Sequence, residues 1–213
     1  MAGRQQGQRG NSRSSGAHGP VVVGIAPDGR EMLLIERAQQ WRDWLEDHHG
    51  TVDGVWLVSW RSVTGRPRMT YEESIEAALR VGWIDSHVRR MDDERIRLLH
   101  TPRRRGSVWS ALNKQRVARL AASGDLLPAG LAAVERAKAD GSWEALEASD
   151  RLEVPPDLAA ALDAVAGARQ TYDAWPASTR KLVIYQVTSA KRDATRERRI
   201  DLVVTAAREG RRP

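Results

Sequence analysis

The chain of 213 residues contains no cysteine and no phenylalanine. Without cysteine there are no disulfides, no thiolate catalysis and no Cys-ligated zinc. No apolar run approaches the ~20 residues of a membrane-spanning helix. The first residues also lack the apolar core of a signal peptide. We therefore expect a cytoplasmic protein with no membrane span.

Tryptophan takes the place of phenylalanine, with eight indoles against three tyrosines. Aromatic side chains dominate the burial of apolar area in protein cores, so we expect most of the indoles in the core. The hydrophobic fraction of 41% is enough to form one. This composition favours a globular protein over a disordered one.

The formal net charge of +6 is unevenly distributed along the chain. Residues 1–20 carry Arg4, Arg9 and Arg13 and no acid, and their Gln/Gly/Ser content predicts a disordered basic tail. The remainder has 31 basic residues against 28 acidic ones and is only mildly basic. A basic balance is typical of proteins with anionic partners, although here the tail supplies half of the net charge.

The pattern of apolar residues and turn signals predicts an α+β fold with a small antiparallel β-sheet packed by helices and a mainly helical C-terminal half. We expect a basic tail (1–20), an α+β core (21–150) and a C-terminal helical region (151–210) that packs on the core as one domain. The expected strands span 21–25, 32–35, 55–61, 83–91 and 95–101. The expected helices span 38–49, 70–81, 107–122, 126–140, 155–166, 176–192 and 193–209.

The richest stretch for function begins at Gly82 and runs through a predicted hairpin to Asn113. Strict alternation along the first strand would place Trp83, Asp85 and His87 on one face, opposite Ile84, Ser86 and Val88. The hairpin is followed by three consecutive arginines and then by a predicted helix. This density of indole, guanidinium and hydroxyl groups marks the predicted functional surface.

The arginines lie between a strand end and a helix N-terminus, where free backbone N–H groups and the helix dipole favour an anion. Arginine adds bidentate donors suited to carboxylate or phosphate. The sequence thus predicts a pocket for a small anionic ligand, lined by Trp83, Asp85, Arg103, Arg104, Ser107, Trp109, Ser110 and Asn113. In the alternative interpretation, the arginines pair with the acids of the hairpin and the serines only cap the helix.

Asp85 and His87 are the candidates for acid–base catalysis. A buried carboxyl group with a raised pKa suits such a role, whereas the simpler interpretation is that Asp85 fixes an arginine. His87 and His100 lie on the two arms of the hairpin, but no third ligand is spaced for a metal. We therefore expect no metal site and no cofactor.

The segment 191–199 is dense in bases and is a candidate for binding the phosphates of nucleic acid. Asp193, Glu197 and Asp201 are interleaved with those bases at spacings that allow ion pairs within a helix. A solvated, salt-bridged helix with Asp193 as its N-cap is therefore the favoured interpretation. The alternative, that Thr195 and Arg196 fold back to the central site, stays open.

Nine short motifs together resemble the YdeI/OmpD-associated family, also called bacteriocin-protection proteins. They are Trp41-x-x-Trp44-Leu45, Val55-Trp56-Leu57, Tyr71-x-Glu73, Ala78-Leu79-x-x-Gly82-Trp83-Ile84-Asp85, Thr101-Pro102-Arg103-Arg104, Ser107-x-Trp109-Ser110-x-x-Asn113, Gly124-x-Leu126-x-Pro128-Ala129-Gly130, Ala137-Lys138-x-Asp140-Gly141-x-Trp143 and Ala190-Lys191-x-x-Ala194-Thr195-Arg196. The resemblance covers about 32–210. It implies a role in tolerance of bacteriocins or cationic antimicrobial peptides and in stress, with no agreed catalytic mechanism.

Three functional hypotheses follow. The leading one is a cytoplasmic protein of this kind with an anion-binding pocket. The second is a small-molecule enzyme with Asp85 or His87 as base and Arg103 as anion anchor. The third is a nucleic-acid-binding module that uses the basic tail and the last helix. The sequence leaves the oligomeric state and the ligand open.

Overall fold

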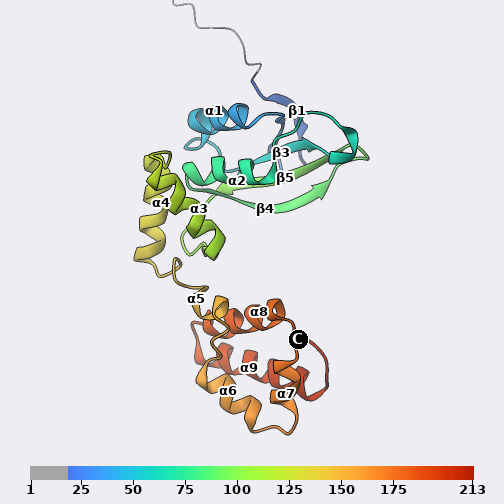
Figure 1. Cartoon of the computed structure of the whole chain (residues 1–213), viewed down its shortest axis with the longest axis vertical. Coiled ribbons are helices and arrows are strands. Elements are labelled where there is room, and N and C mark those ends of the chain that lie inside the picture. The colour runs from blue at the N-terminus through green and yellow to red at the C-terminus, as the bar shows by residue number, and fades with distance from the viewer. Residues whose placement is uncertain (1–18) are drawn as a thin grey trace, which may run out of the picture.

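The computed structural model describes residues 19–213, so nearly all of the predicted basic tail lies outside the described residues. A five-stranded sheet in the order β1-β2-β3-β5-β4 forms the N-terminal half (Figure 1). Its strands are β1 (Val21–Ile25), β2 (Glu31–Leu34), β3 (Val55–Trp60), β4 (Trp83–Arg90) and β5 (Arg95–Pro102). Helices fill the C-terminal half, which confirms the predicted α+β class.

The helices extend from one end of the molecule to the other. They are α1 (Ala38–His48), the short 3-10 helix η1 (Ser62–Thr64), α2 (Tyr71–Arg80), α3 (Ala111–Ala122), α4 (Pro128–Ala139), α5 (Glu147–Asp150), α6 (Pro156–Asp163), α7 (Ala168–Asp173), α8 (Ala177–Thr188) and α9 (Asp193–Arg208). Helices α6–α9 gather away from the sheet (Figure 1). Within residues 19–213, no helix is long and apolar enough to cross a membrane.

The sheet is mostly antiparallel, as expected, but one pair of strands is parallel. Strand β2 pairs with β3 in parallel, Leu33 opposite Leu57, whereas the other three pairings are antiparallel. Parallel neighbours need a crossover connection, and helix α1 supplies it between β2 and β3. The crossover brings α1 and α2 together on a core with three of the tryptophans, Trp41, Trp44 and Trp83.

The predicted alternation along β4 fails beyond Asp85. Asp85 pairs with His100, but the register then shifts and Val88 pairs with Leu98. Because residues two apart on β5 share a face, Val88 lies on the face of Asp85 rather than on the opposite one. A β-bulge at this place is a feature of tertiary pairing, and the sequence pattern gives no sign of it.

Local signals at helix ends are largely confirmed. The Thr70 hydroxyl accepts a hydrogen bond from the Glu73 amide at 3.2 Å, and a Glu73 carboxylate oxygen accepts one from the Thr70 amide at 2.8 Å. In the C-terminal half, α7 was not predicted, and α9 has Arg192 rather than Asp193 as its N-cap. Helices α6–α9 share a core that includes Leu158, Tyr172 and Val203.

Helix α4 approaches the turn between α2 and β4 so closely that only glycine fits. A Cβ atom on Gly130 would collide with the Arg80 carbonyl group and lie 2.7 Å from a Leu126 methyl group. Gly82 has a φ of +75°, and a Cβ there would lie 2.7 Å from the Ala133 Cβ. The two glycines thus set the distance between α4 and the α2–β4 turn.

We expect Gly130→Ala to lower the free energy of unfolding by about 1–3 kcal/mol, because overpacking forces backbone shifts. Chemical denaturation followed by circular dichroism measures the change. Gly50→Ala is the matched control, since no atom lies within 4 Å of a Cβ built there. Equal stability of the Gly130→Ala variant and the wild type would contradict the close approach.

Candidate functional site

The loop between β5 and α3 holds the predicted arginines and is fixed at both ends. The Arg103 amide donates to the Gly82 carbonyl at 3.0 Å, next to the α2–β4 turn. The Gly106 amide donates to an Asp140 carboxylate oxygen at 2.9 Å. The Ser142 amide donates to the other Asp140 oxygen at 3.0 Å. Asp140 therefore clips the arginine loop to the C-terminal end of α4.

The Arg103 side chain is buried in this loop and only partly satisfied. Its guanidinium carbon lies 3.5 Å from the centre of the Trp109 ring, which is a cation–π contact. Nη1 donates to the Val108 carbonyl at 3.1 Å and to the Ser107 hydroxyl at 3.3 Å. Nε and Nη2 are buried without a hydrogen-bond partner among the described residues, although Arg103 is only 6% exposed.

Arg103 remains a cation despite its burial. Desolvation lowers its pKa to about 10, and the negative charge of Asp85 opposes that shift. A guanidinium group whose pKa is 10 is still protonated at neutral pH. The loop therefore contains a buried positive charge with two free N–H donors, which is the chemistry that an anion recognises.

Two adjoining spaces lie beside this charge. The arginine hollow is an open depression of about 290 Å³ lined by Arg105, Arg136, Ala139 and Asp140. The inner gap, of about 10 Å³, is lined by Arg103 and Trp109 and shares Arg105, Arg136 and Asp140 with the hollow. The gap has room for about one water molecule, so it connects the free donors of Arg103 to the hollow.

The exposed side chains at the hollow carry an excess of positive charge. The side chains of Arg105 and Arg136 form no hydrogen bond and no close ion pair with any described residue, although the charge of Arg105 acts on Asp140. Arg104 is exposed and also lines the inner gap. The Ser142 hydroxyl and then the amides of Ser142 and Gly106 hold the pKa of Asp140 below its usual value, so this carboxylate is ionised. Four arginines thus surround one carboxylate that is already hydrogen-bonded.

Sequence reasoning left Arg136 and Asp140 out of the site. Both lie on or just after α4, more than twenty residues beyond Asn113 in the sequence. Their signal was present in the motif that runs from Ala137 through Asp140 to Trp143, but it did not indicate contact with the arginine loop. Trp143 lies beside Trp109, with the ring centres 5.0 Å apart.

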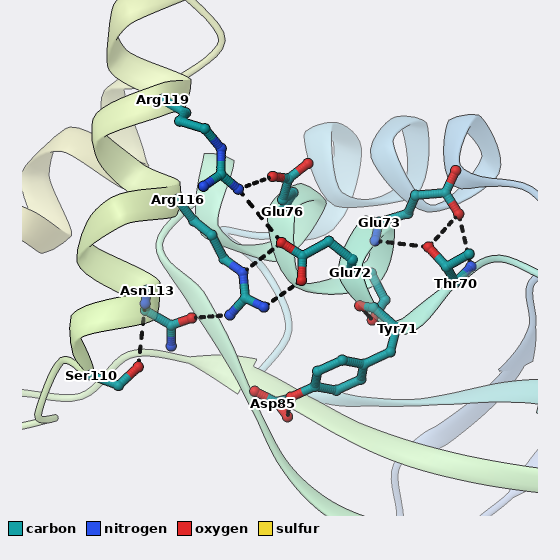
Figure 2. Close-up of polar contacts among 11 residues, drawn as sticks. Thr70, Tyr71, Glu72, Glu73, Glu76, Asp85, Ser110, Asn113, Arg116 and Arg119 are labelled. Carbon is teal, nitrogen blue, oxygen red and sulfur yellow. Dashed lines mark hydrogen bonds and ion pairs between the residues drawn. The ribbon is translucent and has the colours of Figure 1, made fainter.

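Ser110 and Asn113, predicted to line the pocket, contact a different network (Figure 2). The Ser110 hydroxyl caps α3 by accepting from the Asn113 amide at 3.3 Å, as the alternative interpretation had it. The Asn113 side-chain oxygen accepts from Arg116 at 2.7 Å. Arg116 also donates to both carboxylate oxygens of Glu72. These residues join α3 to α2 rather than lining the hollow.

Asp85 is held by a tyrosine rather than by an arginine. The Tyr71 hydroxyl donates to an Asp85 carboxylate oxygen at 2.8 Å (Figure 2). Burial and this hydrogen bond raise the pKa of Tyr71 to about 12. Trp83, the neighbouring site candidate, is 1% exposed and donates from Nε1 to the His49 carbonyl at 3.2 Å. Its indole packs in the core and does not face solvent.

The two histidines of the hairpin have opposite environments. His87 is exposed and makes no hydrogen bond or ion pair with the described residues. His100 is 0% exposed, packed edge-on at 5.1 Å from the Trp41 ring. Neither ring nitrogen of His100 forms a hydrogen bond of normal geometry. The Leu98 backbone is nevertheless close enough to raise the pKa of His100 slightly against the larger effect of burial. No group of three metal-ligating side chains occurs between residues 19 and 213.

Two arginines of the basic segment in α9 bind to residues of the neighbouring helices α6 and α8. Arg196 pairs with Asp157 of α6 at 2.6 Å and donates to the Val187 carbonyl at 3.0 Å. Arg199 donates to the Gln186 carbonyl and to the Ser189 hydroxyl. The ion pairs expected within α9 do not form among the described residues, because Arg196 reaches across to α6 instead. Arg196 also does not fold back to the arginine loop.

Two family models match separate parts of the chain. Residues 33–133 match a family described as a domain of unknown function (DUF8412). Residues 151–210 match the family described as bacteriocin-protection, YdeI or OmpD-associated. The C-terminal segment is therefore similar to this bacteriocin-protection family. The predicted resemblance is thereby confirmed for these residues, which contain the motif from Ala190 to Arg196.

Most of the other motifs that suggested the bacteriocin-protection family lie within residues 33–133, whose matching family carries no functional description. No curated protein and no solved structure matches the chain. The arginine hollow lies outside the segment 151–210. Its chemistry therefore has to be argued from its own contacts.

We expect Glu72→Gln to destabilise the fold by roughly 1–2 kcal/mol, because Arg116, whose side chain is 6% exposed, loses its counter-charge. The loss is smaller than for a fully buried pair because the Glu72 side chain is 48% exposed. Urea denaturation measures it, with exposed Glu135→Gln as control. Adding Arg116→Met to Glu72→Gln should restore part of the stability. A single variant as stable as the wild type would contradict this account.

Burial lowers the pKa of His100 from 6.5 to about 4. Between these pH values the unfolded chain binds a proton at His100 that the folded chain does not, so stability falls as the pH is lowered. We expect this fall to reach about 3 kcal/mol. In His100→Leu the contribution disappears, while stability at pH 7 changes little. Denaturation at several pH values tests this, and parallel profiles for the two proteins would refute it.

Proposed function

We propose that this protein binds a small anion, a phosphate or a carboxylate, in the arginine hollow. The observation that carries the proposal is Arg103, which is 6% exposed and yet has two N–H donors without a partner among the described residues. Buried donors without a partner are costly, and a buried cation that no carboxylate contacts directly is more so, because Asp85 acts on Arg103 only through its charge and not through a hydrogen bond. An anion in the arginine hollow, linked to Arg103 through a water molecule in the inner gap, would reduce both costs.

The surroundings of Arg103 support the same ligand chemistry. Arg105 and Arg136 face the open hollow with no ion-pair partner, so they would attract an anion and hold its outer oxygens. The hollow, at about 290 Å³, is near the lower limit of ordinary ligand sites. This size suits a phosphate group or a small di- or tricarboxylate.

The biological role we propose is tolerance of bacteriocins or cationic antimicrobial peptides, together with stress, in the cytoplasm. It rests on the family that residues 151–210 match. A cytoplasmic protein would not contact an extracellular peptide directly. We therefore infer that the protein contributes to tolerance indirectly, through a cellular process in which the bound anion takes part. The hollow supports the proposed anion binding, and the family match of residues 151–210 supports the proposed role in tolerance. The two arguments are independent, because the hollow lies outside that segment.

No specific observation favours the enzyme or nucleic-acid hypotheses over this one. Asp85 is engaged by Tyr71, and His87 lies exposed without a partner, so the two do not form an acid–base pair. In α9, Arg196 and Arg199 make contacts with α6 and α8 and are not free for phosphates. Lys191, Arg192 and Arg198 are exposed on or next to α9.

Thermal unfolding with inorganic phosphate, pyrophosphate or citrate at constant ionic strength tests the proposal. A ligand at about 100 times its dissociation constant stabilises by roughly 2.7 kcal/mol, which raises Tm by about 5 °C or more in a chain of this size. We expect the double variant Arg105→Gln with Arg136→Gln to lose this rise.

The matched control is Arg208→Gln, an exposed arginine in the last turn of α9 that should keep the full rise. Arg103→Ala is a second variant, expected to lose the rise if it folds, as judged by circular dichroism. A rise of the same size in the double variant and the wild type would overturn the proposal. So would the absence of any rise with all three anions.

A further inference from the structure

A second cavity lies at another part of the sheet, between the N-terminal end of α2 and the face that carries β3, β4 and β5. Apolar side chains from the three strands and from the segment just before α2 line it, namely Leu57, Met69, Val88, Ile96 and Leu98. The bulge in β4 contributes directly, because it turns Val88 onto this face beside Leu98. None of these residues contacts the arginine hollow.

The hydroxyl groups around the cavity already donate elsewhere. The Ser59 hydroxyl donates to the Trp60 carbonyl at 3.4 Å, and the Ser74 hydroxyl donates to the Tyr71 carbonyl at 2.6 Å. The Thr70 hydroxyl donates to Glu73, and the Tyr71 hydroxyl donates to Asp85. None of these protons is available to a ligand, so the interior of the cavity selects an apolar body.

Arg68 is the exception in this lining. It is exposed and also lines the cavity, so it lies where the cavity meets solvent. It forms no hydrogen bond or ion pair with any residue between 19 and 213. Its neighbour Met69 is 5% exposed, so the backbone of Arg68 is anchored while its guanidinium group is free.

Arg66, two residues earlier, provides a contrast. Its guanidinium carbon lies 4.1 Å from the centre of the Trp60 ring, and Nη2 lies 3.7 Å from a Glu94 carboxylate oxygen. Arg66 is therefore engaged, whereas Arg68 is a free cation next to an apolar cavity. A free guanidinium group pairs with carboxylates in a bidentate geometry.

We propose that this cavity binds a small monocarboxylate with a short branched apolar body. The carboxylate pairs with Arg68, and the body enters the space lined by Val88, Ile96 and Leu98. The free volume of about 90 Å³ is smaller than the roughly 150 Å³ cavity that accepts benzene, which excludes a long acyl chain or a nucleotide. This site is separate from the arginine hollow and does not depend on the function proposed there.

The test compares two matched probes, 4-methylpentanoate and its neutral amide, by NMR titration of the full chain. The acid should shift resonances of the residues around the cavity and bind at least about tenfold more tightly than the amide, because only the acid pairs with Arg68. Arg68→Gln should remove this preference. Arg89→Gln, an exposed arginine on β4 with no partner among the described residues, should keep it.

A third variant tests the apolar part of the site. Val88 is 56% exposed, so Val88→Phe is expected to fold and to fill the cavity, weakening the acid about tenfold or more. Equal affinity for acid and amide in the wild-type protein would overturn the proposal. So would resonance shifts confined to the arginine hollow, or no shifts at a probe concentration of about 50 mM, at the weak-binding end of the affinity scale.

Discussion

The close contact between α4 and the turn that joins α2 to β4 positions most of what surrounds the arginine loop. Gly130 allows the backbones to touch, and the Leu127 amide donates to the Arg80 carbonyl at 3.0 Å. The same turn presents the Gly82 carbonyl to the Arg103 amide. One tight crossing therefore fixes both α4, which carries Arg136, and the first arginine of the loop. A larger side chain at the crossing would separate the two walls of the hollow.

Tryptophan supplies the aromatic packing that phenylalanine supplies in other cores, and its indole N–H group can also donate a hydrogen bond. Trp56 donates to Asp28 at 3.0 Å, Trp60 donates to Glu36 at 3.0 Å, and Trp41 donates to the Ser74 carbonyl at 3.1 Å. The indole faces also accept guanidinium groups, as Trp109 does for Arg103. Tryptophan forms stronger cation–π contacts than phenylalanine does. An arginine-rich chain with indoles in its core can therefore stabilise a buried guanidinium group better than a phenylalanine core could.

The parts of the fold that depend on local chemistry could be predicted from the sequence. The capping box at Thr70, the end of α2 before Gly82 and the cap at Ser110 each involve residues within a few positions of one another. The pairing of β4 with β5 followed from a turn between two apolar runs. The family assignment of residues 151–210 followed from a motif within that segment.

The parts that depend on distant residues could not be predicted in this way. Nothing near Arg103 in the sequence indicates that Asp140 fastens its loop, since Gly106 and Asp140 lie 34 residues apart along the chain. The bulge that places Val88 beside Leu98 and the complete burial of His100 arise from the register between two strands. The predicted lining therefore included the arginine loop together with Ser110 and Asn113, which contact α2, and it omitted Arg136 and Asp140, which line the hollow.

The carboxylate of Asp140 has a further consequence for how the arginine loop behaves. Its two oxygens accept amide hydrogen bonds from Gly106 and Ser142, so the loop is closed before any ligand arrives. Loops that order only on binding lose conformational entropy at that moment and weaken the complex. A loop that these two hydrogen bonds already hold in place would lose little of that entropy if the proposed anion bound.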